Sequence, residues 1–388
     1  MIPNYNVSFL GGQYFFTGTE ANLSGNLHVL ASPALKYSDK FMLLPIYSMK
    51  YQGVKQVTDL VGGGTLFQEK NNHKMGLKGV YTKSEKWAYK TSLGYTWEFL
   101  KETRDERWGE GLFDYQRPAI GIEAEYTYKD PFSVRFMYDF YQVNFINYES
   151  LESQVAAGVD SGLGREYAGK DTLDSNNHAL SVVGSRPVKI RETPIVLEGG
   201  INVTMRHHPD QMRVKSNGLY ATDKRDDMVY TLSAGSLFPL KRGGKTKVTG
   251  TFGLGYSIND SNQHNYDAGK LEYTQNYYDY NKLRVSPGAS FMFGEDEAMA
   301  RRLSFNYTYE LQDYKKRRVQ DSEGLYKTNT INTKTHVATG SFMYPLEEKM
   351  KVNFTISYGK SKSNMKYESV YKYNFDTLNY LFGITYTY

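Results

Sequence analysis

The chain contains no cysteine among its 388 residues, which excludes disulfides, thiolate metal sites and thiol catalysis. No stretch approaches the roughly 18 consecutive apolar residues that a membrane-spanning helix requires, so a helical membrane protein is also excluded. The chain has no large excess of either charge, because its 47 Lys and Arg residues are nearly balanced by 42 Asp and Glu residues. The resulting net charge of +5 does not indicate nucleic-acid binding.

Aromatic residues are abundant, with 35 Tyr, 20 Phe and 3 Trp, although 23% of residues are charged. They recur at alternate positions, which places them on one face of a strand. From Trp87 to Phe99 this face would carry Trp87, Tyr89, Thr91, Leu93, Tyr95, Trp97 and Phe99, and the other face Ala88, Lys90, Ser92, Gly94, Thr96 and Glu98. Similar runs begin at Phe132, Lys247, Arg302 and Lys351.

These runs are longer than the strands of soluble proteins, which average about 5–6 residues. Their length of about 9–14 residues suits a tilted strand that crosses a bilayer. Trp87 and Trp97 share a face and lie ten residues apart. That separation corresponds to about 25 Å of height, the distance between the aromatic girdles of a membrane barrel. A soluble sandwich is the alternative, but only a closed barrel hides the backbone of so polar a chain in lipid.

The last residues, Leu378–Tyr388, alternate in the same way and end on an aromatic side chain. This segment resembles the C-terminal strand of bacterial outer-membrane β-barrel proteins of the porin-like class. The resemblance implies an assembly signal at Phe382, Ile384, Tyr386 and Tyr388, which the barrel-assembly machinery would read. It also implies outer-membrane lipid around the barrel. Such a protein must be exported, so we expect that a signal peptide once preceded Met1.

The connections between the alternating runs are short and long in turn. Short ones fall at 38–40, 84–86, 130–131, 190–193, 241–245, 295–299 and 347–349, and long ones at about 57–72, 103–112, 149–175, 208–225, 259–276, 316–332 and 363–374. Short periplasmic turns and long extracellular loops are typical of outer-membrane barrels. We therefore predict an all-β, antiparallel transmembrane barrel of about sixteen strands, a single domain over 1–388 with both termini periplasmic. If Asn4–Phe16 does not form the first strand, fourteen or fifteen remain.

Strand parity also predicts which charged side chains face the lumen. This set comprises Lys50, Lys78, Lys90, Glu98, Glu123, Glu125, Arg135, Asp139, Glu198, Arg206, Lys247, Arg284, Glu310 and Lys351. Both signs occur among Ser, Thr, Asn and Gly, which indicates a lumen that is wet or filled with ion pairs. A barrel of this size leaves an aqueous pore unless something fills it. Alternatively, the charges pair with one another and only stiffen the wall.

Two long loops could modify the pore. The loop at Glu149–Ser175 could fold inward, as a long loop does in classical porins, or cover the mouth as a lid. The loop at 265–281 carries five tyrosines, which could recognise glycans or proteins, or form the outer aromatic girdle.

We therefore predict a channel for passive diffusion of small hydrophilic solutes, with weak ion selectivity because both charges are present. The alternative is a non-transport accessory barrel that docks outer-membrane partners through its loops, in a nutrient-receptor or secretion complex. We expect no cofactor and no metal, since His207, His208 and Asp210 lack a third helix-spaced ligand. No catalytic triad is visible, so we expect no enzyme, although a hydrolase at the barrel rim stays possible.

Overall fold

The computed structural model describes residues 1–17, 21–53, 55–59, 64–103, 105–129, 132–150, 164–190, 193–241, 245–369 and 371–388. Nearly all of this part of the chain is strand or strand connection, and a 3₁₀ turn occurs at Arg165–Tyr167. None of the described residues belongs to a helix long and apolar enough to span a membrane.

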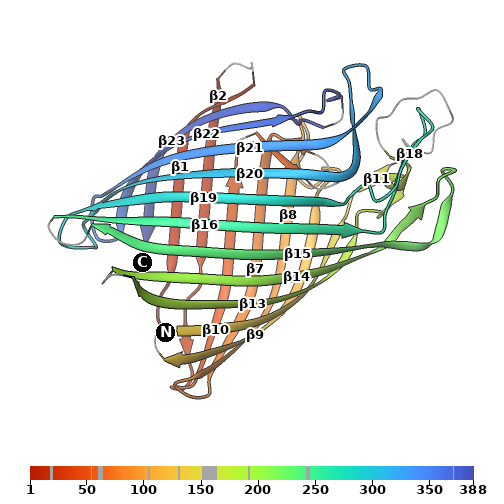
Figure 1. Cartoon of the computed structure of the whole chain (residues 1–388). Coiled ribbons are helices and arrows are strands. Elements are labelled where there is room, and N and C mark those ends of the chain that lie inside the picture. The colour runs from red at the N-terminus through yellow and green to blue at the C-terminus, as the bar shows by residue number, and fades with distance from the viewer. Residues whose placement is uncertain are drawn as a thin grey trace.

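The strands form one closed antiparallel barrel, in which each strand pairs with the next and β1 pairs with β23 (Figure 1). Within the described residues its wall has sixteen strands. They are β1 (Tyr5–Phe16), β2 (Asn22–Ala31), β4 (Phe41–Gln52), β7 (Glu69–Thr82), β8 (Trp87–Lys101), β9 (Tyr115–Lys129), β10 (Phe132–Phe145), β13 (Ser175–Ile190), β14 (Thr193–Val214), β15 (Tyr220–Lys241), β16 (Thr246–Ser261), β19 (Tyr280–Phe293), β20 (Arg301–Gln320), β21 (Tyr326–Pro345), β22 (Met350–Ser363) and β23 (Phe375–Thr387).

Several shorter strands lie outside this set. The two-residue β3 (Leu35–Lys36) continues β2 in the same register against β4. The gap between them lies at Pro33, opposite Pro45, where neither residue has an N–H to donate to the ladder. The others form small hairpins in the long connections, namely β5 (Gln56–Asp59), β6 (Gly64–Phe67), β11 (Glu149–Ser150), β12 (Gly169–Lys170), β17 (Asn265–Asp267) and β18 (Glu272–Thr274).

The outer face of the wall is apolar and exposed, as the alternation in the sequence predicts. Leu93 on β8 pairs with Leu77 on β7 and Ile120 on β9, and their exposed fractions are 58%, 40% and 46%. A soluble sandwich would bury such a face. The prediction of an antiparallel transmembrane barrel is therefore confirmed, and β1 and β2 confirm the first hairpin over the fourteen-strand alternative.

Short and long connections alternate along the barrel, and Figure 1 shows both termini near the end that carries the short turns. The predicted turn at 130–131 lies outside the described residues, as do residues 191–192 of the turn predicted at 190–193 and residues 242–244 of the turn predicted at 241–245. The two loops predicted at 208–225 and 316–332 are wrong, because most of their residues belong to strands. β14 continues to Val214 and β15 begins at Tyr220, whereas β20 continues to Gln320 and β21 begins at Tyr326. Gly218 and Gly324 close these long hairpins with positive φ angles of 76° and 79°.

The four residues of the predicted assembly signal lie where β23 pairs with β1 and closes the barrel, which we call the seam. Phe382, Ile384 and Tyr386 on β23 pair with β1, and their exposed fractions of 59%, 46% and 43% place them on the outer face. Tyr388 follows β23, and its amide and carbonyl both bond to the backbone of Tyr5. Their recognition by an assembly machinery stays a prediction.

Gly383 makes the seam sensitive to side-chain size. A Cβ atom at this position would meet the carbonyl oxygen of Phe9 and the Cα of Leu10 well inside contact distance. We therefore expect Gly383→Val to weaken barrel closure by about 1–3 kcal/mol, the usual cost of overpacking. The midpoint temperature of the shift from fast to slow gel migration should fall. Gly235→Val is the control, since the contacts of a Cβ there are ordinary, at 3.8 Å and 3.9 Å.

Candidate functional site

The face opposite the exposed apolar side chains is polar, and it carries all fourteen charged residues assigned by parity to the lumen. Cross-strand register places Lys50, Lys78, Lys90, Glu98, Glu123, Glu125, Arg135, Asp139, Glu198, Arg206, Lys247, Arg284, Glu310 and Lys351 on this face. That these residues line a water-filled pore stays a prediction.

Several of these charges pair with neighbours along the wall. The Lys90 Nζ lies 2.6 Å from Glu123 and 2.8 Å from Glu125. The Arg284 guanidinium lies 2.6 Å from Glu310 on the next strand. These pairs join adjacent strands, so they stiffen the wall and leave less free charge on it.

From β21 through β23 to β1 the polar face consists mainly of hydroxyl and amide groups. Thr339 Oγ1 lies 3.0 Å from Ser357 Oγ. Asn353 donates to Thr385 at 2.8 Å, and Thr385 donates to Ser8 at 2.9 Å across the seam. This side of the barrel offers solutes neutral hydrogen-bonding groups, whereas β4 and β7–β10 offer charges.

A packed layer of loop residues lies at the long-loop end of the barrel. Its apolar cluster is formed by Phe67, Leu100, Phe113, Phe145, Tyr148, Tyr167, Leu173 and Tyr278, with Tyr277 and Tyr371 packed against it. These residues come from strand ends and from the connections that follow β4, β8, β10, β16 and β22. We call this cluster the loop layer. It joins connections from around the barrel.

Glu166 and Tyr167 place the predicted long loop within the loop layer. Both side chains are fully buried, and the Tyr278 hydroxyl donates to Glu166 at 2.9 Å and lies 2.6 Å from the Tyr167 hydroxyl. The Arg225 guanidinium lies 4.0 Å from the Tyr278 ring centre. Residues 151–163, the remainder of that predicted pore loop, lie outside the described residues.

The tyrosine-rich loop at 265–281 contributes to the layer, which the sequence did not suggest. Tyr278 is 3% exposed and hydrogen-bonded, and Tyr277 packs beside it. These two tyrosines are therefore unavailable as surface recognition groups, and they do not belong to an outer girdle.

A second cluster connects the layer to the extended β20–β21 hairpin, and Arg317 lies at its centre. The Arg317 guanidinium lies 4.5, 5.1, 5.9 and 6.0 Å from the rings of Tyr277, Tyr314, Tyr373 and Tyr371. It donates to the Tyr373 hydroxyl at 2.6 Å. Four rings around one desolvated cation form a strong cation–π cage.

Two loop carboxylates make the loop layer sensitive to pH. Asp114 accepts a bond from the Leu100 amide at 2.7 Å, and Asp174 accepts one from the Phe145 amide at 2.7 Å. Burial raises the pKa of each carboxyl to about 6. In both cases the folded layer binds the proton more tightly than an opened, solvated layer does.

Acidification should therefore stabilise the layer. A raised carboxyl pKa favours folding at low pH, and this advantage is lost as pH rises from about 4 through about 6. At pH 5 the amides of Leu100 and Phe145 should exchange hydrogen more slowly than at pH 7, after correction for the intrinsic rate. The pair Asp114→Asn and Asp174→Asn should reduce this difference, and equal protection at both pH values in the unmodified protein would contradict the expectation.

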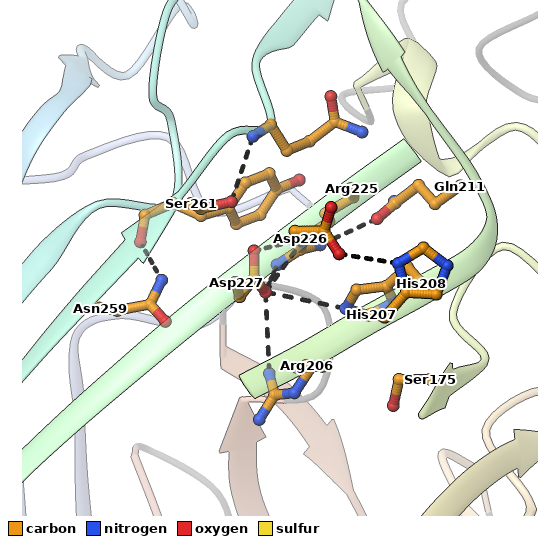
Figure 2. Close-up of polar contacts among 12 residues, drawn as sticks. Ser175, Arg206, His207, His208, Gln211, Arg225, Asp226, Asp227, Asn259 and Ser261 are labelled. Carbon is orange, nitrogen blue, oxygen red and sulfur yellow. Dashed lines mark hydrogen bonds and ion pairs between the residues drawn. The ribbon is translucent and has the colours of Figure 1, made fainter. Parts of the chain in front are cut away.

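The rim near β14 and β15 carries paired histidines and aspartates (Figure 2). His207 Nδ1 lies 2.7 Å from Asp226, and both side chains are exposed. His208 is buried, with its Nε2 3.7 Å from Asp227, which Arg225 holds through a 2.8 Å ion pair. The adjacent histidines thus face different partners.

The chemistry available at this rim is limited. A cavity of about 570 Å³ lies beside His207 and Asp226, and it also includes Arg213 and His264. Among the described residues no group of three or more His, Asp or Glu side chains could hold a metal ion. The His207–Asp226 pair can orient an imidazole for proton transfer, so the hydrolase alternative stays open.

The same register reveals inner-face cations that the sequence analysis did not name. Lys74 pairs with Ser48 and Thr96, and Thr96 pairs with Arg117 on β9. Lys70 lies at the same face near the loop layer, 5.5 Å from the Phe67 ring. Parity alone would have found Lys74 and Arg117, whereas Lys70 fell within a predicted loop.

Comparisons with known proteins agree with this architecture. No family description and no curated protein sequence matches the chain. Pseudomonas putida OprB is 11% identical, with a TM-score of 0.51 and coverage of 100% of this chain and 94% of that chain. A bacterial polysaccharide outer membrane secretin is 8% identical, with a TM-score of 0.49 and coverage of 100% and 98%. CymD, a monoaromatic hydrocarbon channel, is 10% identical, with a TM-score of 0.41 and coverage of 100% and 89%.

At these identities the similarity concerns the fold alone. The closed sixteen-strand barrel with its exposed apolar belt therefore has the fold of the bacterial outer-membrane β-barrel proteins. The same features support a location in the outer membrane.

Proposed function

We propose that this barrel is a channel for passive diffusion of small hydrophilic solutes, and that its loop layer regulates entry. The polar inner face is the observation that carries the proposal. Hydroxyl, amide and charged groups line it from β4 to β10 and from β21 to β1, so it can replace the hydration of a polar solute. A barrel of about sixteen strands is wide enough for an aqueous path.

The test is conductance in planar bilayers, with the unmodified protein and with Tyr278→Ala. Removing this ring loosens the layer, because Glu166, Tyr167 and Arg225 all lose a contact. We expect brief openings in the unmodified protein and longer openings in the variant. Tyr256→Ala, on the exposed outer face, is the control and should behave like the unmodified protein. If both proteins fold but neither conducts, the channel proposal is wrong.

An accessory role in an outer-membrane complex is the second candidate. Leu219, Leu271 and Leu325 favour it, because they lie at three connections of the long-loop end with exposed fractions of 58%, 72% and 52%. Exposed apolar side chains of this kind can dock a protein partner. Gentle detergent extraction followed by mass spectrometry distinguishes the roles. A docking role is supported if the unmodified protein retains a stoichiometric partner and the triple variant Leu219→Ser, Leu271→Ser and Leu325→Ser loses it.

We further propose that the barrel-assembly machinery reads Phe382, Ile384, Tyr386 and Tyr388, and that both termini are periplasmic. The outward position of the first three side chains supports this proposal. Phe382→Ser should reduce the amount of folded barrel in cells more than it reduces refolding yield in detergent. Equal losses in the two settings would favour a purely structural role.

A further inference from the structure

The polar faces of β4, β7, β8 and β9 carry a concentration of cations just below the loop layer. Two neighbouring rows of cross-strand partners define it. One row contains Lys74 and Arg117, and the next contains Lys50 beside Asn72 and Glu98. Lys70 lies one row nearer the mouth. We call Lys50, Lys70, Lys74 and Arg117 the cationic belt, and Glu98 is the acid that shares its rows.

The acids of this wall offset only part of the belt's charge. Glu98 interacts electrostatically with Lys50, Lys70 and Arg117, and Asp139 interacts with Lys74 and Arg117. Lys90 holds both Glu123 and Glu125, further toward the short turns. Glu98 accepts a hydrogen bond from Asn72. Among the described residues, no carboxylate oxygen lies within 4.0 Å of the charged nitrogens of Lys50, Lys74 or Arg117. The four cations of the belt still outnumber the two carboxylates Glu98 and Asp139, so its net charge is positive.

The belt is also available to a solute. Lys50 and Lys74 are exposed although they lie on the inner face. The Arg117 Nε is buried and has no hydrogen-bond partner, and its guanidinium lies 5.5 Å from the Tyr141 ring. An ammonium attracts an anion as a point charge, and a guanidinium can bind carboxylate or phosphate through two bonds.

The position of the belt determines what it would select. The Lys70 Nζ lies 5.5 Å from the ring centre of Phe67 in the loop layer, so the belt begins next to this layer. Charges fixed to a low-dielectric wall concentrate counter-ions in a confined path. The wall from β21 to β1 consists mainly of hydroxyl and amide groups, so it does not offset this field.

We propose that the cationic belt makes the barrel selective for small anions, with carboxylate- or phosphate-bearing solutes as its substrate class. This inference rests on the proposed channel function and refines the expectation of weak selectivity. The belt accumulates anions below the loop layer, while Lys90 with its two glutamates contributes structure. Selectivity should decline as salt approaches 1 M, because the Debye length then falls to about 3 Å.

The decisive measurement is the reversal potential in a potassium chloride gradient, recorded for the unmodified protein and for Lys50→Gln combined with Lys74→Gln and Arg117→Gln. We expect chloride to be preferred by the unmodified protein, and the triple variant to lose most of that preference. Lys360→Gln is the control, because it also removes a positive charge, but from the outer face, where Lys360 lies beside Asp376. Its reversal potential should match that of the unmodified protein.

A second measurement separates this inference from the channel proposal. Binding of inorganic phosphate to the detergent-solubilised protein is followed by phosphorus NMR line broadening, which requires no conductance. Broadening that the triple variant loses and Lys360→Gln retains supports the belt, even in a barrel that does not conduct. Cation preference in the conducting protein, or equal phosphate broadening in all three proteins, would overturn the inference.

Discussion

Leu93→Arg should destabilise the barrel by roughly 2–4 kcal/mol or block its assembly, the cost of a cation on the lipid face near the bilayer midplane. Leu93 is the seventh residue of the 15-residue strand β8, and its neighbours Leu77 and Ile120 are also exposed and apolar. Neither of these two neighbours can pair with the new charge. Urea unfolding in lipid vesicles, followed by tryptophan fluorescence, would measure the loss.

Ser92→Arg is the matched control, because it places the same side chain one residue away on the opposite face. Ser92 pairs with Lys78 and Gly121 on the polar face, where an arginine can remain hydrated or approach Asp139. We expect it to fold normally and to change conductance or selectivity instead. If the two substitutions are tolerated equally, or if Ser92→Arg alone prevents folding, the assignment of faces is inverted.

The wall of the barrel could be predicted from sequence because its physics is periodic. Lipid on one side and polar groups on the other require alternation with a period of two, so residues such as Leu93 and Lys90 identify their own faces. The end of each run also indicates a turn. The positions of fourteen charged residues on one face required nothing more than this parity.

The loop layer could not be predicted in the same way, because no local period connects its members. Phe67, Tyr167 and Tyr278 are far apart in sequence and meet only in the folded barrel. Tyrosine composition indicated recognition or a girdle, and neither applies to Tyr278, which is buried against Glu166. The β14–β15 and β20–β21 extensions were missed for a related reason, because polar strands above a membrane resemble loops in sequence.

Arg317→Ala should open the loop layer while it leaves the barrel wall intact. Arg317 is 2% exposed, and truncation removes its contacts with four tyrosine rings and leaves the Tyr373 hydroxyl without its donor. A desolvated cation–π contact is worth up to about 2 kcal/mol, and an unfilled cavity adds to the loss. We therefore expect the layer to lose about 3–5 kcal/mol of local stability, in line with other large-to-small core substitutions.

Hydrogen exchange and single-channel recording together test this expectation. Amides at 277–278 and 371–373 should lose protection in Arg317→Ala, open times should lengthen, and gel migration of the unheated protein should stay that of a folded barrel. Lys316→Ala, at the exposed neighbouring position, should change none of these. Arg317→Lys keeps the charge but lacks the planar guanidinium that lies among the rings, so its effects on protection and open time should be intermediate between those of Arg317→Ala and Lys316→Ala. Full protection in Arg317→Ala would show that the apolar cluster holds the layer without the cage, and the role assigned to Arg317 would then be wrong.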